Sequence, residues 1–145
     1  MNPSEIVAGM VVTHPYARTV TDADNLAATL SSLNTAQLHF NVEAARELLG
    51  GRFSERIVVG SCVLAIVTGL ATAGWGTPYL TELGMGSLRF HFPVYAGDTI
   101  AATSEVLAAD PADDGSTVVV RTRLTGANQR GETVASLTRT FGARL

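Results

Sequence analysis

Asn34, His39 and Gly60 are the residues whose types and spacing are best suited to chemistry in this sequence. Asn34 and His39 lie in a segment without clear periodicity, which predicts a loop, and Gly60 begins a long apolar stretch. A histidine can move protons near neutral pH. Free N–H groups at a helix start can stabilise an oxyanion, and glycine lets a carbonyl approach them. The residues therefore fit an acid–base site, although they also fit an ordinary loop histidine and a glycine chosen for packing.

A helix must position Gly60, and the stretch from Ile57 to Trp75 can form it. The stretch contains no charged residue, and its apolar side chains fall on every face of a helical wheel. A helix of this kind lies inside a protein or inside a membrane. Because the stretch is near the lower length limit for a membrane span, we predict a buried helix from about Gly60 to Gly74. The side chains predicted to be buried in it are Cys62, Ile66, Val67 and Leu70.

Two short helices are predicted upstream of this helix. Thr21, with Asp24 three residues later, is typical of a helix start, and this helix is expected to run to about Leu33. Asn41 is the predicted N-cap of a second helix over residues 42–49. Before both helices, residues 9–20 predict a short edge strand, in which His14 is expected to be exposed and without a role.

Strands are predicted after Trp75, where the apolar pattern changes period. The segment Gly84–Gly86 is expected to break the first stretch. In residues 87–94, Leu88, Phe90 and Phe92 alternate with polar residues, which predicts a half-buried strand with His91 on its solvated face. Further strands are predicted over residues 99–108, 117–125 and 132–142. The predicted fold is one α+β domain, residues 1–145, with an antiparallel sheet curled around one buried helix.

Composition excludes several classes of function. The net charge of −3 argues against general affinity for nucleic acid or anionic membranes, and the absence of lysine excludes Schiff-base chemistry. The single cysteine cannot form an intrachain disulfide, and the scattered histidines predict no metal site. No phosphate-binding glycine loop is present, so no cofactor is expected. The first ten residues do not resemble a signal peptide, which favours a cytoplasmic location.

Three segments together resemble the MaoC-like hydratases of the hotdog fold. They are Asn34-x4-His39, the Val58-Val59-Gly60 entry into the long helix, and Arg89-Phe90-x2-Pro93-Val94-x2-Gly97-Asp98-Thr99. The resemblance covers about residues 19–142. It implies addition or removal of water at the C2–C3 bond of an acyl thioester on coenzyme A or an acyl carrier. It also implies a homodimer, because this fold usually pairs sheets edge to edge, and the charge argues against a nucleic-acid or membrane partner.

The resemblance assigns roles to individual residues. It implies that His39 is the general acid–base group and that the Gly60 N–H holds the thioester carbonyl. Ser61 and Thr68 would contact the substrate. Asn34 falls where the family usually has an aspartate, and an amide cannot accept a proton at pH 7.

This departure leaves three options open. His39 acts as both base and acid, another carboxylate enters the site, or the chain is a non-catalytic thioester-binding subunit. The sequence NTAQLH is similar to a branch of the family that acts on short branched dicarboxylic acyl-CoAs such as mesaconyl-CoA, where asparagine is normal at this position. We therefore expect a hydratase or dehydratase for a short acyl-CoA. A hotdog thioesterase is a weaker alternative.

Overall fold

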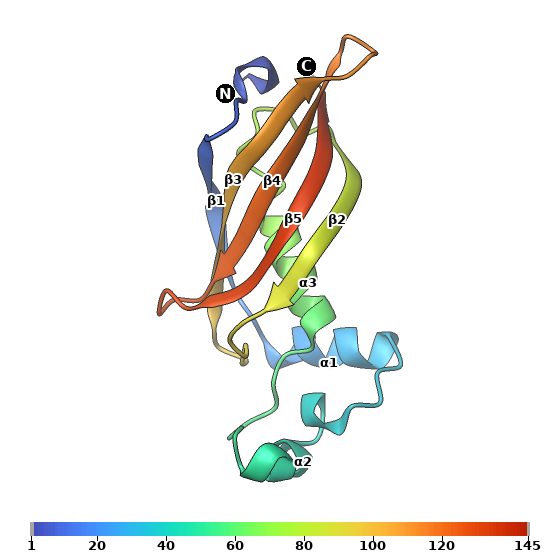
Figure 1. Ribbon diagram of the computed structural model, residues 1–145. Helices are drawn as coiled ribbons and strands as arrows, with labels where there is room; N and C mark the ends of the chain where they lie inside the picture. Colours follow the sequence, from blue (N-terminus) through green and yellow to red (C-terminus); the bar gives the residue numbers. More distant parts are fainter. Residues whose placement is uncertain (1, 145) are drawn as a thin grey trace.

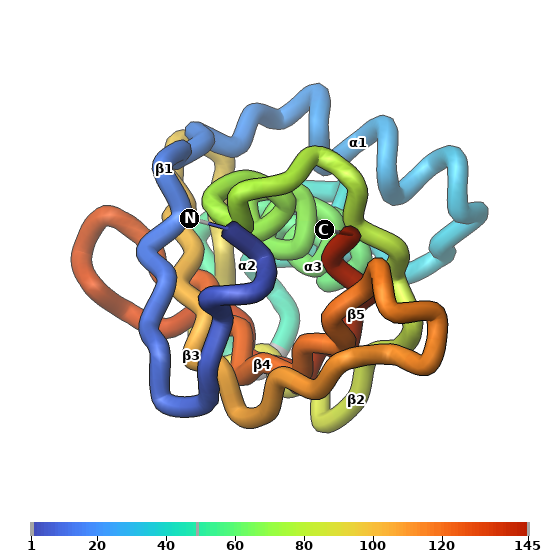
Figure 2. The backbone as a smooth tube through the Cα atoms, turned by 90° about the horizontal axis from the view of Figure 1, so that it is seen from above, coloured from blue at the N-terminus to red at the C-terminus, as the bar shows by residue number. Residues whose placement is uncertain are grey.

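The computed structural model describes residues 2–144, in which a five-stranded antiparallel sheet curls around one helix (Figures 1 and 2). The order of the strands in the sheet is β1-β3-β4-β5-β2, so β1 and β2 form its edges. The bounds are β1 Val11–Thr19, β2 Leu80–Phe90, β3 Thr99–Pro111, β4 Thr117–Ala127 and β5 Thr133–Arg144. The predicted α+β arrangement is confirmed, and the last three strands extend beyond their predicted ranges.

Helix α3 (Gly60–Leu70) lies on the concave side of this sheet, where Figure 2 shows it end on. Cys62, Ile66 and Val67 are buried as predicted, and burial raises the pKa of the Cys62 thiol. The prediction was wrong in two respects. Leu70 is only half-buried, and the helix ends there rather than at Gly74. One face of the helix, made of small residues, is also exposed at Ser61, Ala65 and Gly69.

The opposite face of α3 packs directly on the main chain of β4 at Gly126. A Cβ atom built at Gly126 would lie 2.4 Å from Cγ2 of Val67, which is fully buried. Packed carbon atoms do not approach so closely. Gly126 therefore sets the depth at which the helix sits in the sheet, because any side chain there would hold α3 away.

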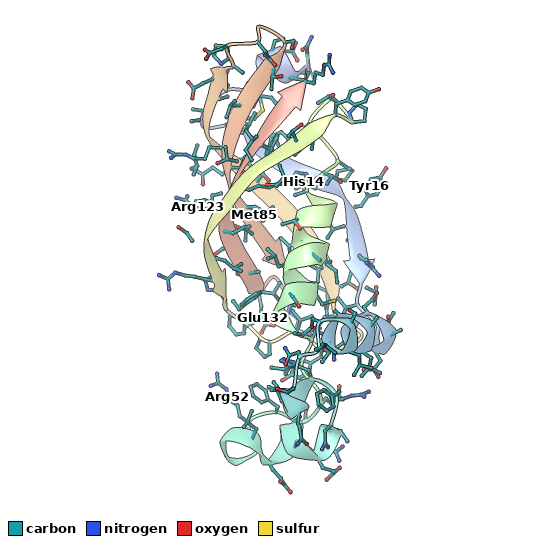
Figure 3. The ribbon with its side chains drawn as sticks, turned by 90° about the vertical axis from the view of Figure 1, so that its right-hand side faces the viewer. His14, Tyr16, Arg52, Met85, Arg123 and Glu132 are labelled. Atoms are coloured by element: carbon teal, nitrogen blue, oxygen red, sulfur yellow. The ribbon has the colours of Figure 1, made fainter. Side chains whose placement is uncertain are left out.

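The C-terminal end of α3 is held by three buried side chains. Nε1 of Trp75 and Nη1 of Arg139 both donate to the Ala71 carbonyl, each at 2.9 Å. His14 lies at the same end of the helix (Figure 3), where its Nδ1 donates to the Ala73 carbonyl at 2.7 Å. The guanidinium suits the negative end of the helix dipole. The two bonds to Ala71 satisfy the carbonyl of the C-cap residue, which a helix end leaves free, and the bond from His14 holds the turn that follows.

His14 is therefore not the exposed, idle residue that the sequence predicted. Only 4% of its surface is exposed, and its Nε2 lies 2.8 Å from the hydroxyl of Ser104. Burial lowers the pKa of His14, and the charge of Arg139 lowers it further, although the hydrogen bond to Ala73 acts in the opposite direction. The neutral ring joins edge strand β1 to the end of α3.

Strand β2 also differs from its prediction. The segment Gly84–Gly86 does not break it but lies within it, paired with β5. The strand ends at Phe90, and Leu88, Phe90 and Phe92 are 40–51% exposed rather than turned into the core. Residues 81–92 form an exposed, partly apolar edge of the sheet.

The two short upstream helices lie beyond one end of the sheet, where α1 is beside the first turn of α3 and α2 is farther out (Figure 1). Helix α1 (Asp22–Ser31) begins with the predicted capping box, in which Thr21 and Asp24 each bond the other's main-chain N–H. Helix α2 (Val42–Glu47) is capped by Asn41 as predicted. Each helix is two residues shorter than predicted. The predicted loop between them contains a 3-10 turn, Gln37–His39.

Candidate active site

One cavity brings His39 and Gly60 together. It has a volume of about 300 Å³ and lies between the N-terminal end of α3, the segment before α3 and the end of β2. Its lining residues are His39, Arg52, Phe53, Ile57, Val58, Gly60, Val63, Phe90, His91, Phe92, Pro93, Val94 and Val134. A mostly apolar pocket with a few convergent polar groups is typical of a small-molecule site.

The imidazole of His39 is held by the segment that leads into α3. Its Nδ1 lies 2.9 Å from the carbonyl oxygen of Ile57. Because a carbonyl oxygen only accepts, the neutral ring carries its proton on Nδ1 and has a lone pair on Nε2. Within residues 2–144, no hydrogen-bond partner is found for Nε2. The ring is therefore oriented as a base by its main-chain contact.

Gly60 is the first residue of α3 and follows Val59, an N-cap that contributes no side-chain hydrogen bond. The first N–H groups of a helix lack partners within the helix. A Cβ atom on Gly60 would lie 2.8 Å from Cζ of Phe90, so the aromatic ring closely covers this glycine. The helix start thus lines the cavity with a main-chain donor that its own helix does not use, and the ring limits what can lie above it.

The other site residues named from the sequence lie outside this cavity. Asn34 lines a separate hollow with Leu30, Leu33, Thr35, Gln37 and Phe40, and its Oδ1 accepts from the Ala36 N–H at 2.9 Å. Ser61 is exposed on α3. The hydroxyl of Thr68 donates to the Leu64 carbonyl of its own helix at 2.8 Å. The structure therefore brings together His39 and Gly60, but it does not bring Asn34, Ser61 or Thr68 to them.

Sequence reasoning missed the polar side chain that lies between the two halves of the site. Asn25, on α1, is 1% exposed. Its Nδ2 donates to the His39 carbonyl at 2.8 Å, and its Oδ1 accepts from the Val59 N–H at 2.9 Å. The signal for it was weak, because an asparagine in the second turn of a helix fits a solvated face equally well.

Arg52 and His91 were also missed as cavity residues. Both line the cavity with His39, and no aspartate or glutamate is found in the lining within residues 2–144. The His91 ring is held by β5, where its Nε2 lies 2.8 Å from the Ser136 hydroxyl. In the described part of the chain Arg52 thus supplies the one permanent charge of the lining, which favours an anionic ligand over a cationic one.

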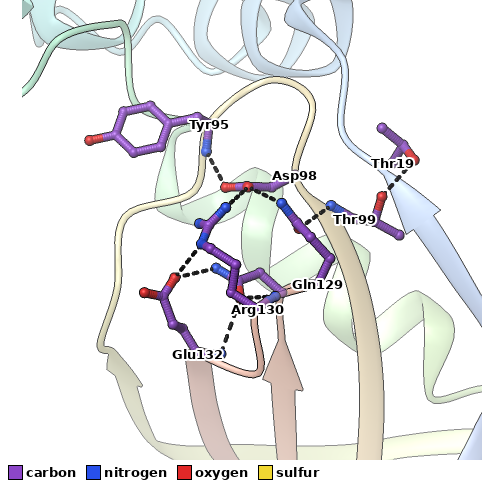
Figure 4. Close-up of polar contacts among 8 residues, drawn as sticks. Thr19, Tyr95, Asp98, Thr99, Gln129, Arg130 and Glu132 are labelled. Carbon is purple, nitrogen blue, oxygen red and sulfur yellow. Dashed lines mark hydrogen bonds and ion pairs between the residues drawn. The ribbon is translucent and has the colours of Figure 1, made fainter.

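The turn between β2 and β3 forms one wall of the cavity, through Pro93 and Val94, and is fixed by Asp98 (Figure 4). The Asp98 carboxylate accepts from the Tyr95 N–H, the Gln129 amide and the Arg130 guanidinium at 2.9–3.0 Å. Burial alone would raise the pKa of Asp98, but these bonds lower it below its ordinary value. Gly97 takes a left-handed φ of +96° in this turn. The Gly-Asp motif noted in the sequence thus holds the conformation of the turn that forms this wall of the cavity.

Metal-binding clusters and membrane-spanning helices are both absent from residues 2–144. No group of three or more histidine, cysteine, aspartate or glutamate side chains there is placed to hold a metal ion. None of the helices in that range is both long and apolar enough to span a membrane.

Comparison with known proteins gives a coherent result. The family described as MaoC like domain matches residues 4–128. The beta-methylmalyl-CoA dehydratase of Chloroflexus aurantiacus is 37% identical over 100 residues, which make up 69% of this chain. The matched region is 27% of that enzyme, so the chain spans only about a quarter of this relative's length.

Solved structures show the same fold. The monoamine oxidase regulatory protein of Archaeoglobus fulgidus superposes with a TM-score of 0.82 at 29% identity, covering 99% of this chain and 94% of that one. An unliganded R-hydratase of Pseudomonas aeruginosa superposes with a TM-score of 0.74, covering 99% of this chain and 90% of the hydratase. At 23% identity, this second similarity shows the hotdog fold alone.

Proposed function

Because the chain belongs to the MaoC-like dehydratase family, we propose that it is a hydro-lyase acting on a short acyl-CoA thioester. The observation that carries the proposal is the presence of His39 and the Gly60 helix start in one cavity. An acid–base group and an oxyanion-binding donor are the two functions that addition of water to an enoyl thioester requires.

In the hydration direction, the Gly60 N–H donates to the thioester carbonyl oxygen. Nε2 of His39 takes a proton from water as the oxygen of that water bonds to C3. The electron pair of the C2–C3 double bond moves toward the carbonyl, and the resulting enolate oxygen is stabilised by Gly60. The imidazolium then returns the proton to C2, so one water is added and His39 is regenerated. Dehydration is the reverse sequence.

In this proposal His39 acts as base and acid in turn, and Asn34 supports the loop that carries it. The Asn34 carboxamide accepts from the Ala36 N–H directly before the Gln37–His39 turn. Direct contact of Asn34, Ser61 or Thr68 with the substrate remains a prediction of the family resemblance.

We further propose that the acyl group is short, branched and dicarboxylic. The named relative is a dehydratase of beta-methylmalyl-CoA, and the cavity of this chain carries Arg52 and His91 without a lining carboxylate in the described part of the chain. An arginine can bind a carboxylate with two parallel hydrogen bonds. Arg52 is thereby assigned to the second carboxylate of the substrate.

The test compares hydration of mesaconyl-CoA and crotonyl-CoA by the parent and by Arg52→Gln. The expected result is that mesaconyl-CoA is the better substrate and that Arg52→Gln weakens it selectively. Loss of the charge-assisted hydrogen bonds between Arg52 and the carboxylate should raise KM by about 10-fold or more. If the parent prefers crotonyl-CoA, or if both substrates are affected equally, the dicarboxylic assignment is wrong.

A non-catalytic thioester-binding subunit is the second candidate, and the asparagine at position 34 favours it. The same assay separates the two, because such a subunit would bind the thioester without adding water. Release of free thiol instead of hydration would indicate a thioesterase.

We also propose a homodimer formed along β2. Leu83, Met85, Leu88 and Phe90 are 40–55% exposed on this strand, and its outer edge has unpaired main-chain groups. The edge continues into the cavity wall, so a second copy placed there would border the site.

Light scattering should give twice the chain mass of 15.2 kDa. Met85→Glu should shift this mass to that of the monomer, whereas Val11→Glu, on the opposite edge, should not. A parent monomer at micromolar concentration would contradict the proposal.

A further inference from the structure

We infer that Asn25 is the positioning residue that sets His39 relative to the oxyanion-binding helix start. The inference rests on the proposed function, but it concerns a residue that contacts neither water nor thioester in that mechanism. Asn25 lies on α1, whereas His39 and Gly60 lie on two later segments of the chain. Its carboxamide forms one of two links between these segments, and the other is the bond from the His39 ring to the Ile57 carbonyl.

The chemistry of the two contacts explains why this residue is an asparagine. The His39 carbonyl requires a donor and the Val59 N–H requires an acceptor, so the partners themselves fix the orientation of the amide. Aspartate lacks the donor, and leucine lacks both groups. Only an amide of this length satisfies both partners from one position on α1.

The contacts are placed at the two points that matter for the mechanism. Val59 is the residue directly before Gly60, so its N–H is the last main-chain donor before the proposed oxyanion donor. The His39 carbonyl belongs to the same residue as the acid–base ring. On the other side, the ring Nδ1 bonds the Ile57 carbonyl. The loop of His39 is thus attached twice to the three residues that precede Gly60.

Burial makes the loss of these hydrogen bonds costly. Asn25 is 1% exposed, and its Oδ1 receives a further, longer bond of 3.4 Å from the hydroxyl of Thr29, which is fully buried. Hydrogen bonds inside a protein are strong, and removing one partner leaves a buried polar group unsatisfied. Loss of the Asn25 donor therefore moves the His39 loop rather than letting water replace the bond.

The first experiment measures kcat and KM for hydration in Asn25→Asp, which keeps the shape and the acceptor but loses the donor. A displacement of the acid–base ring by about 1 Å lowers the rate about 10²-fold. We expect a loss of this size in kcat with KM close to the parent value. Asn25→Ser, which is too short to span both partners, should give the same split.

A second readout does not depend on turnover. In the parent, the Nδ1–H proton of His39, bonded to Ile57, should give a protected resonance in the proton NMR spectrum. In Asn25→Asp this resonance should shift or broaden. The control is Ser104→Ala, which removes another buried hydrogen bond at the far end of α3. Its stability should fall, while kcat and the His39 resonance should remain those of the parent.

The outcomes separate the inference from the proposed function. A parent that hydrates no acyl-CoA would contradict the proposed function, and the NMR comparison would still test the attachment of His39. An active parent with unchanged kcat and His39 resonance in Asn25→Asp would overturn the positioning role. Failure of both Asn25 variants to fold would also overturn it, because Asn25 would then be a residue required for folding in general.

Discussion

The His39 ring and the Ile57 carbonyl are joined by a hydrogen bond of 2.9 Å, which determines the ring nitrogen available for chemistry. Ile57 lies three residues before Gly60, so the segment that starts the oxyanion-binding helix also orients the proton carrier. The two functions of the site therefore have one structural support. A disturbance of that segment should affect both together.

The first prediction concerns the ring itself. His39→Ala and His39→Gln should each lower kcat for hydration by about 10²–10⁴-fold, the usual contribution of general acid–base catalysis. Melting temperatures should change little, because His39 lies in a half-buried turn outside the main core. The loss of enoyl-thioester absorbance measures the rate. Parent-like rates in either variant would remove His39 from the mechanism.

Gly60→Ala tests the access to the helix start. The added Cβ would lie 2.8 Å from the Phe90 ring, so the ring must move into the cavity where the thioester carbonyl would bind. We expect kcat/KM to fall, by at most about 10²–10³-fold, the effect of losing an oxyanion donor.

Two further variants control this result. Gly69→Ala, on the exposed face of the same helix, has no atom within 4 Å of its new Cβ and should keep full activity. Adding Phe90→Leu to Gly60→Ala should restore part of the loss. If Gly69→Ala and Gly60→Ala behave alike, the effect is on the helix and not on the carbonyl site.

Asn34→Asp examines the departure from the usual aspartate. A carboxylate can accept the Ala36 N–H as the amide does, and the side chain lines a hollow separate from the His39 cavity. We therefore expect activity close to that of the parent. A rise of about 10²–10⁴-fold would instead show that a restored carboxylate reaches the substrate as a general base. A selective loss with dicarboxylic substrates would place the new charge beside the substrate anion.

The sequence pattern was sufficient to predict the sheet and the central helix, and the family resemblance implied that His39 and Gly60 lie together. These features depend on the spacing of apolar residues, on helix caps and on one sequence motif, all of which are local. Strand β2 was mispredicted because its apolar alternation is that of a core strand, although the strand lies at the edge of the sheet. His14 and Asn25 were missed because their partners are distant in sequence: Ser104 and Ala73 for His14, and His39 and Val59 for Asn25. A single sequence gives no information on such long-range polar contacts.

His14 should make stability depend on pH. Burial lowers its pKa in the folded state below the ordinary value of 6.5, so the unfolded chain binds more protons as the pH falls. The stabilising contribution is therefore complete above pH 6.5 and decreases as the pH drops below it. Urea unfolding between pH 7.5 and pH 5 would measure this slope. The slope should be smaller in His14→Gln, and an identical slope in that variant would assign it to other groups.

Gly126→Ala tests the contact between α3 and the sheet. The new Cβ would lie 2.4 Å from Val67, and overpacking of this kind usually costs about 1–3 kcal/mol of folding free energy. Denaturant unfolding should show this loss. Gly84→Ala, on β2, meets no atom within 4 Å and serves as the control. Adding Val67→Ala to Gly126→Ala should relieve the clash, and failure to do so would place the cost elsewhere.

The position of β5 has a consequence for synthesis of the protein on the ribosome. Within the described residues β2 has one neighbour in the sheet, β5, yet β2 ends at Phe90 and β5 begins at Thr133. At about 5–20 residues per second, a nascent chain needs several seconds to supply that partner. During this time the apolar side chains of β2 have neither a neighbouring strand nor a folded core beside them. A nascent chain paused between these strands would therefore be a preferred target for chaperones.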